Sequence, residues 1–210
     1  MPETVEIGAR EAWRPRRPRV PPDIRYPFML GSTACFCSWA AGGLFLALVP
    51  SYAASLLQAH NPMVGGGTLF IMFGCAAVVQ VFLRKLPSAR AIALGTVALI
   101  AGLAAIVAAM PLHSLWLLLA GSVLDGVGLG LGFMGGLGLV GLVAPPESRA
   151  EVLSACYVVN YLGLGLPVVG VGLASGSVGL FAAVTGFAAV VGCVCLLLAL
   201  AVSFHPPRRT

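Results

Sequence analysis

The chain has 210 residues, of which 59% are hydrophobic and 9% charged, and its formal net charge is +5. A soluble domain of this size has roughly a quarter charged residues and under half apolar ones. The apolar excess is too large for one soluble core, so the composition excludes a soluble fold and predicts an integral membrane protein.

Polar or Pro/Gly-rich breaks divide the apolar region into six runs, each long enough for a membrane-spanning helix of about 20 residues. The runs are Phe28–Leu57, Met63–Leu83, Ala89–Met110, Ser114–Val143, Val152–Ala174 and Val178–Ser203. The sequence therefore predicts an all-α integral membrane protein with a six-helix bundle over residues 27–204. A basic, Arg/Pro-rich tail over residues 1–26 and a short tail over residues 205–210 are expected to flank the bundle in the cytoplasm.

The positions of the cations predict how the helices are oriented. All twelve Lys and Arg residues fall in the two tails or at the second and fourth connections. If six helices alternate in direction, these segments share one side of the membrane, and Lys and Arg mark the cytoplasmic side. We therefore expect a multi-pass protein of the cell membrane with both termini cytoplasmic. The spans also divide into three plus three of opposite orientation, as in the inverted repeats of secondary carriers.

Several stretches resemble carriers of the major facilitator superfamily. Pro2–Val5 resembles the end of the sixth helix in these carriers, and the basic tail after it looks like their central loop. Leu83–Arg90 is similar to the basic loop between paired helices, although the Asp and Gly of the full pattern are missing. Gly126–Gly136, Ala144–Glu151 and Tyr157–Gly163 are similar to the tenth and eleventh helices of efflux members.

The resemblance covers nearly the whole chain, but only the C-terminal six of the family's twelve helices. It implies transport of a small-molecule substrate by the C-terminal half of a proton-coupled efflux carrier. Because the family works by rocking one half against the other, the chain is expected to need a complementary N-terminal six-helix half or a second copy. The alternatives are a dimeric six-helix carrier and a non-transporting membrane subunit or fragment that stabilises or regulates a partner.

Asp125 is the only ionisable acid or base well inside a predicted span. It follows Ser114 by eleven residues, which at 1.5 Å per residue is roughly 16 Å, near the middle of a ~30 Å hydrocarbon core. An acid at that depth costs on the order of 3 kcal/mol and is a functional candidate by default. No Lys or Arg can reach it, so the neutral acid is favoured, which suits cation binding or a proton-coupling site formed by Asp125 and Ser122. The alternative is a structural acid hydrogen-bonded to Ser122 on the same helix face.

A polar stripe at helical spacing follows the fifth span and consists of Ser154, Tyr157, Asn160 and Tyr161. The resemblance implies that the first, second, fourth and fifth spans line a central cavity. Tyr157, Asn160 and Tyr161 are therefore expected to bind substrate, together with Trp39 of the first span, because the amide can hydrogen-bond and the rings can stack. Hydrogen bonding between helices is the alternative for the stripe, and packing in the bundle or against lipid is the alternative for Trp39.

Other kinds of site are not expected. The glycine run from Gly126 to Gly136 lacks the preceding strand of a phosphate-binding loop, so it predicts close helix packing instead. The six cysteines lie in apolar runs without metal-finger spacing, so we expect no metal and no cofactor. The three histidines sit at helix ends and no Ser/Lys pair occurs inside the spans, so we expect no enzyme. No basic patch is interleaved with aromatics, which argues against nucleic-acid binding.

Overall fold

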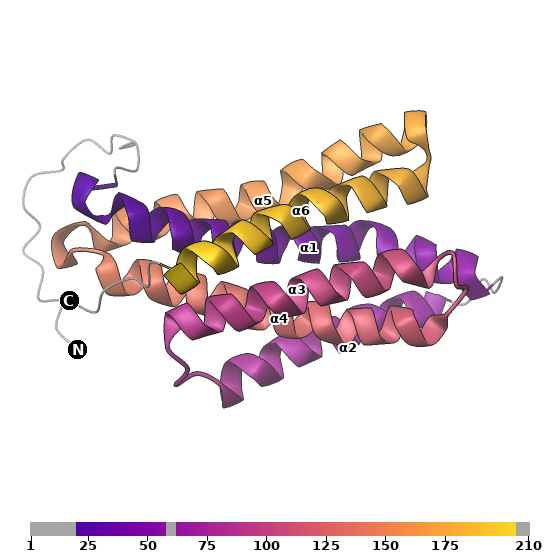
Figure 1. Ribbon diagram of the computed structural model, residues 1–210, viewed down its shortest axis with the longest axis horizontal. Helices are drawn as coiled ribbons and strands as arrows, with labels where there is room; N and C mark the ends of the chain where they lie inside the picture. Colours follow the sequence, from indigo (N-terminus) through magenta and orange to yellow (C-terminus); the bar gives the residue numbers. More distant parts are fainter. Residues whose placement is uncertain (1–19, 58–61, 205–210) are drawn as a thin grey trace, which may run out of the picture.

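The structure, a computed structural model, describes residues 20–57 and 62–204, with side chains for residues 20–47 and 65–204. Within these ranges it contains six α-helices, two short 3₁₀ turns and no strand (Figure 1). All six helices are long and apolar enough to cross a membrane. The predicted all-α fold with six helices of membrane-spanning length is confirmed.

The helix boundaries differ from the predicted spans mainly in α5. The elements are η1 (Pro22–Ile24), α1 (Arg25–Leu57), α2 (Pro62–Phe82), α3 (Ser88–Ala109), α4 (Leu115–Val143), η2 (Pro146–Ser148), α5 (Arg149–Val178) and α6 (Leu180–Phe204). The α5 helix extends beyond its predicted span at both ends. Glu151 lies in its first turn, where the helix dipole favours negative charge. The helix ends at Gly179, whose φ of 85° is a conformation that glycine adopts without strain.

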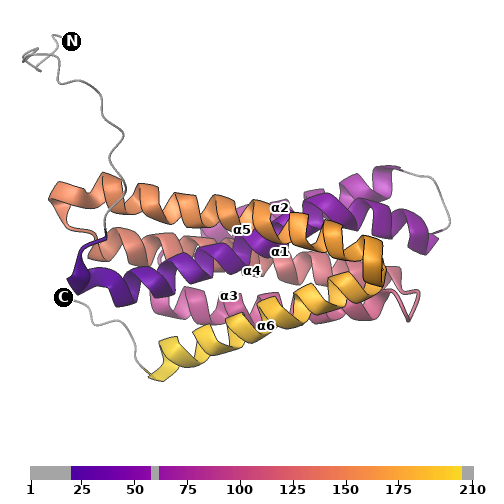
Figure 2. The same ribbon diagram turned by 90° about the horizontal axis from the view of Figure 1, so that it is seen from above.

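The described cations all lie at one end of the bundle. The start of α1, the α2–α3 connection, the α4–α5 connection and the end of α6 share that end (Figures 1 and 2). The Lys and Arg residues of the described ranges belong to these segments: Arg25, Arg84, Lys85, Arg90 and Arg149. We call this the basic end. The α3–α4 connection, which contains His113, lies at the opposite end.

Helix α4 packs against α1, α2 and α3, and glycines bring it close to each of them. The glycines between Gly126 and Gly136 lie on three faces of α4. Gly126 and Gly130 contact α2, Gly128 and Gly135 contact α3, and Gly132 and Gly136 contact α1. A methyl group on Gly136, for example, would lie 2.5 Å from the carbonyl oxygen of Gly31. The prediction that these glycines serve close helix packing is confirmed.

We expect the substitution Gly130→Ala to destabilise the bundle. The added methyl would lie 2.7 to 3.2 Å from three backbone atoms of Ala76, which cannot move unless α2 moves. Overpacking of this kind costs about 1–3 kcal/mol, so the melting temperature of the purified protein in detergent should fall.

Gly74→Ala is the matched control for this substitution. No atom lies within 4 Å of a methyl group at position 74, and alanine favours a helix over glycine by up to about 1 kcal/mol. Its melting temperature should stay the same or rise. Equal melting temperatures for the two variants would contradict the close approach of α2 and α4.

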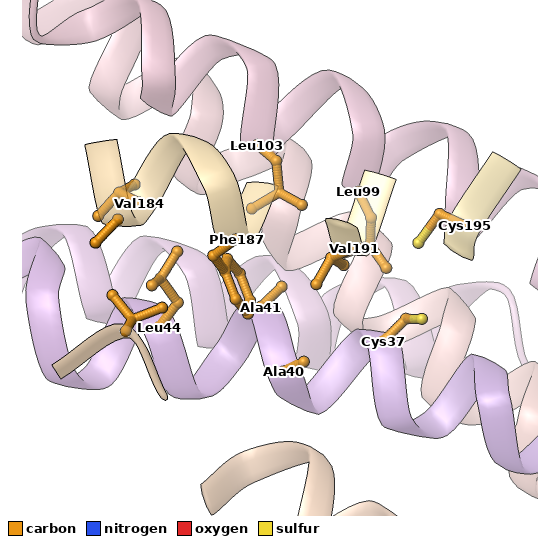
Figure 3. Close-up of a cluster of buried hydrophobic side chains, with 12 residues drawn as sticks. Cys37, Ala40, Ala41, Leu44, Leu99, Leu103, Val184, Phe187, Val191 and Cys195 are labelled. Atoms are coloured by element: carbon orange, nitrogen blue, oxygen red, sulfur yellow. The ribbon is translucent and has the colours of Figure 1, made fainter. Parts of the chain in front are cut away.

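A cluster of twelve buried residues lies between α1, α3 and α6, with Val171 contributed by α5 (Figure 3). Its largest side chains are Leu44 of α1, Leu99 and Leu103 of α3, and Phe187 of α6. Cys37 and Cys195 lie at one edge of the labelled cluster. These contacts hold α6 against α1 and α3, while α5 packs against α1 and α6.

Candidate functional site

The predicted polar stripe of α5 divides between two sides of the helix. The side chains of Tyr157 and Tyr161 point outward, with exposed fractions of 41% and 68%. Ser154 is also exposed, and its hydroxyl donates to the carbonyl oxygen of Ala150 at 2.7 Å. Asn160 is 4% exposed and therefore belongs to the packed side of α5. The helix thus presents two rings and a hydroxyl outward, and one amide inward.

The inward side of α5 lies against α1. Sγ of Cys156, one turn before Asn160, is 4.0 Å from Sγ of Cys35 in α1. A methyl group on Gly163, just under a turn after Asn160, would lie 2.7 Å from the carbonyl oxygen of Phe36. Asn160 lies between these two contacts and is buried at the α1–α5 interface. Its Oδ1 has no hydrogen-bond partner among the described residues.

Trp39 lies one turn after Cys35 on α1. Its ring makes an edge-to-face contact with Phe133 of α4, with centroids 5.8 Å apart and planes at 88°. Its Nε1 is buried and has no hydrogen-bond partner in the described part of the chain. Helices α1 and α5 run in the same direction (Figure 2), and Trp39 and Asn160 each lie one turn beyond the neighbouring cysteines Cys35 and Cys156. The Trp39 side chain packs against a cluster of buried residues from α1, α2, α3 and α4.

A groove of about 520 Å³ lies between α4 and α5 toward the basic end. Tyr157 lines it, and Arg149 is its one charged residue. The remaining lining residues are Met134, Leu137, Gly138, Gly141, Leu142 and Leu153. Sequence reasoning missed Arg149 as a neighbour of Tyr157 in this groove, and Phe133 as the ring in contact with Trp39. Little in the sequence indicates either contact. Arg149 indicates only which side of the membrane the α4–α5 connection occupies, and Phe133 is a single aromatic residue within the glycine run.

Asp125 lies on a different side of α4. Ser114 caps this helix, since its hydroxyl oxygen accepts from the N–H of Leu117 at 3.4 Å, and Asp125 lies three turns further along. Its exposed fraction is 0%, and neither carboxyl oxygen has a hydrogen-bond partner among the residues described. A methyl group on Gly102 of α3 would lie 2.6 Å from Oδ1, so the carboxyl group points at α3. Cys195 of α6 is also near enough for an electrostatic interaction.

Ser122 does not pair with Asp125. Its hydroxyl donates instead to the carbonyl oxygen of Leu118, at 2.8 Å. The Ser122–Asp125 hydrogen bond of the structural alternative is therefore not formed in this structure. The predicted site residues fall into two groups: Trp39, Asn160 and the two tyrosines lie along α1 and α5, whereas Asp125 and Ser122 lie within α4, with Asp125 facing α3.

No known protein family matches the chain, and no similar protein was found among the curated proteins. What the two groups can do has therefore to be argued from their chemistry. Asn160 can hydrogen-bond from the inward side of α5, the two tyrosine rings can stack on an aromatic group from the outward side, and Asp125 can take up a proton. In the described ranges, no cluster of three or more His, Cys, Asp or Glu side chains could hold a metal ion.

Proposed function

We propose that the chain is the C-terminal half of a major facilitator-type secondary carrier that exports a small solute and is coupled to protons. The observation that carries this proposal is the pair of buried groups without partners, Nε1 of Trp39 and Oδ1 of Asn160. Burying a polar group without a hydrogen bond costs roughly 2–7 kcal/mol in an apolar medium. Such groups are understandable in a protein whose polar side chains exchange partners, with substrate bound in one state and water in another.

Two features of the bundle support the carrier architecture. Helix α1 packs against α5, and α4 packs against α2, which is the correspondence expected if α1–α3 and α4–α6 are a 3+3 inverted repeat. The cations gather at one end, so in our proposal the basic end faces the cytoplasm, with both termini on that side of the cell membrane.

Asp125 is the proposed proton site. It faces Gly102 of α3, whereas Asn160 faces α1, so proton and substrate would bind on different sides of the bundle. Helix α4 would connect the two sites, because its glycines contact α1, α2 and α3 directly. Ser122 is bound to Leu118 and leaves both oxygens of Asp125 available to a proton.

The outward face of α5 supports the proposal that another six-helix unit packs against this chain. Tyr161, Tyr157 and Ser154 are exposed there, and Arg149 lies in the adjacent groove. A polar or charged face turned toward lipid is unfavourable, whereas the same face suits a protein contact or a water-filled cavity. We propose that a complementary N-terminal six-helix half covers it, with a second copy of this chain as the alternative.

A non-transporting subunit is the second candidate function, and the complete burial of Asp125 favours it. A scaffold can leave this acid dry and neutral within the bundle, whereas a carrier must let protons reach it. The two functions therefore differ in whether Asp125 titrates, and transport measurements separate them.

Asn160→Leu should reduce uptake roughly 5- to 150-fold without harming the fold. The substitution keeps the side-chain size but removes the hydrogen-bonding groups, and losing one hydrogen bond to a bound solute costs about 1–3 kcal/mol, or roughly 5- to 150-fold. Uptake of a panel of fluorescent lipophilic compounds, measured in vesicles with an imposed pH gradient, is the readout. The melting temperature should not fall, because the substitution removes a buried amide oxygen that has no hydrogen-bond partner among the described residues.

Val97→Leu, on the exposed side of α3, is the control and should leave uptake unchanged. If Asn160 serves only to join helices, Asn160→Leu should instead lower the melting temperature. The uptake per folded molecule should then equal that of the wild type.

Membrane topology can be tested with single cysteines in a cysteine-free background. A cysteine at His113 or Ser175 should react with a membrane-impermeant maleimide added outside the cell, and one at Ser88 or Glu147 should not. His60 would extend the test, but it lies outside the described residues. Labelling of Ser88 from outside would overturn the orientation with both termini inside.

A further inference from the structure

Four of the six cysteines form two close pairs, and both pairs join α1 to a later helix. Sγ of Cys35 lies 4.0 Å from Sγ of Cys156 on α5. Cys37, two residues further along α1, lies beside Cys195 of α6 in the buried cluster between the two helices (Figure 3). All these cysteines are free thiols. Residues two apart on a helix point to different sides, so α1 offers one thiol to each of the two helices that follow α4.

We propose that Cys35 and Cys156 are a site of reversible oxidation, at which hydrogen peroxide converts the two thiols into a disulfide between α1 and α5. In the first step one thiol sulfur attacks the O–O bond, forming a sulfenic acid and releasing water. The second thiol then displaces the sulfenic oxygen as water, and the S–S bond forms. Two electrons pass from the thiols to the peroxide, which ends as two water molecules.

The surroundings of this pair suit the reaction. The sulfur atoms must approach by about 2 Å to bond, a small movement for two helices already in contact. Ser32 lies beside Cys156, and its buried hydroxyl oxygen has no hydrogen-bond partner of ordinary geometry among the described residues. This hydroxyl can hydrogen-bond to the sulfenic oxygen as it leaves.

The pair also lies close to a route from the surface. Leu137 and Leu153 pack against the cluster that contains Cys35 and Cys156, and the same two side chains line the groove between α4 and α5. The thiols are therefore separated from the groove by this layer. Hydrogen peroxide is neutral and close to water in size, so brief movements of the two leucines would admit it.

A disulfide here would restrict the proposed site. Trp39 and Asn160 each lie one turn beyond the paired cysteines, so the bond would fix α1 to α5 next to the unpartnered donor and acceptor. This consequence rests on the proposed function, since it assumes that the two helices shift during transport. Oxidation should then stop uptake, and a thiol reductant should restore it.

The experiment treats the full chain in membrane vesicles with hydrogen peroxide, blocks the remaining thiols, and identifies linked peptides by mass spectrometry. We expect a Cys35–Cys156 link that dithiothreitol reverses and that either Cys35→Ala or Cys156→Ala removes. Cys193→Ala is the control and should retain the link. Because Cys193 is exposed on α6, its conversion to a sulfenic acid reports that peroxide has reached the helices.

The proposal is overturned if Cys193 is oxidised while Cys35 and Cys156 remain free thiols, or if their link forms only after denaturation. Uptake in the same vesicles separates this site from the proposed function. A link that forms without changing uptake overturns the proposed effect on transport and leaves the oxidation site standing. Vesicles that contain the complete carrier and show no uptake even when reduced count against the carrier function, and again leave the site standing.

Discussion

Replacing Asp125 with Asn should abolish proton-driven accumulation of substrate while leaving downhill exchange intact. For coupling to one proton, a gradient of one pH unit supports about tenfold accumulation, because about 1.4 kcal/mol corresponds to a factor of ten. In the Asp125→Asn carrier, the ratio of substrate concentrations on the two sides of the membrane should stay at about one, which means no accumulation. Vesicles that contain the complete carrier, loaded at one pH and diluted into another, provide the measurement.

The structure explains why this substitution is a clean test. Asn has nearly the size of Asp, and neither oxygen of Asp125 has a partner among the described residues that the exchange would disturb. The carboxyl group lies against Gly102, so a larger residue would push α3 away from α4, whereas Asn would not. Only the ability to gain and lose a proton is removed.

Ser122→Ala is the control that distinguishes coupling from packing. The Ser122 hydroxyl is bonded to Leu118 rather than to the carboxyl group, so its removal should leave accumulation near the wild-type value. If Asp125→Asn responds to the pH gradient as the wild type does, Asp125 is a packing acid and the proton-coupling role is wrong.

We expect the purified chain alone to show only background uptake, because a complete carrier needs a second six-helix half. Tyr157 and Tyr161 are 41% and 68% exposed on α5, on the side where a carrier of this kind needs its second wall. Without that wall, bound substrate stays open to lipid and to both solutions, and alternating access cannot occur. Uptake should return when the chain is reconstituted together with a six-helix partner isolated with it from native membranes.

Native mass spectrometry of the extracted protein identifies the form that is active. A one-to-one complex with a different chain supports the split carrier. Robust uptake by a preparation that contains only this chain, present as a dimer, would contradict the need for a second half and favour the six-helix dimeric carrier.

The helices themselves could be predicted well from the sequence, because apolar runs bounded by Pro, Gly and charged residues are strong signals in a membrane. The residues at which the helices begin and end could be predicted less precisely. The predicted fifth span starts at Val152, yet α5 begins at Arg149, since a charged first turn can extend beyond the hydrocarbon while staying helical. Hydropathy measures the apolar length, and helical hydrogen bonding continues past it.

The direction in which a side chain points could not be predicted. The depth of Asp125 follows from its distance to Ser114, but α4 is apolar all the way round and gives no amphipathic pattern from which to read its rotation. Its orientation toward Gly102 depends on how three neighbouring helices pack. The same holds for Cys35 and Cys156, which are 121 residues apart and meet only in the tertiary structure.

The central place of α4 has a consequence for how the protein is made. Helices leave the ribosome in chain order, so α1, α2 and α3 have entered the membrane before α4 emerges. The faces of α1, α2 and α3 that contact the glycines of α4 are then already present. Gly102 of α3, against which the Asp125 carboxyl group lies, is also in the membrane. The one buried acid of the described spans is thus shielded from lipid as soon as its own helix docks. Helices α5 and α6 join afterwards, against a four-helix core that is already closed around α4.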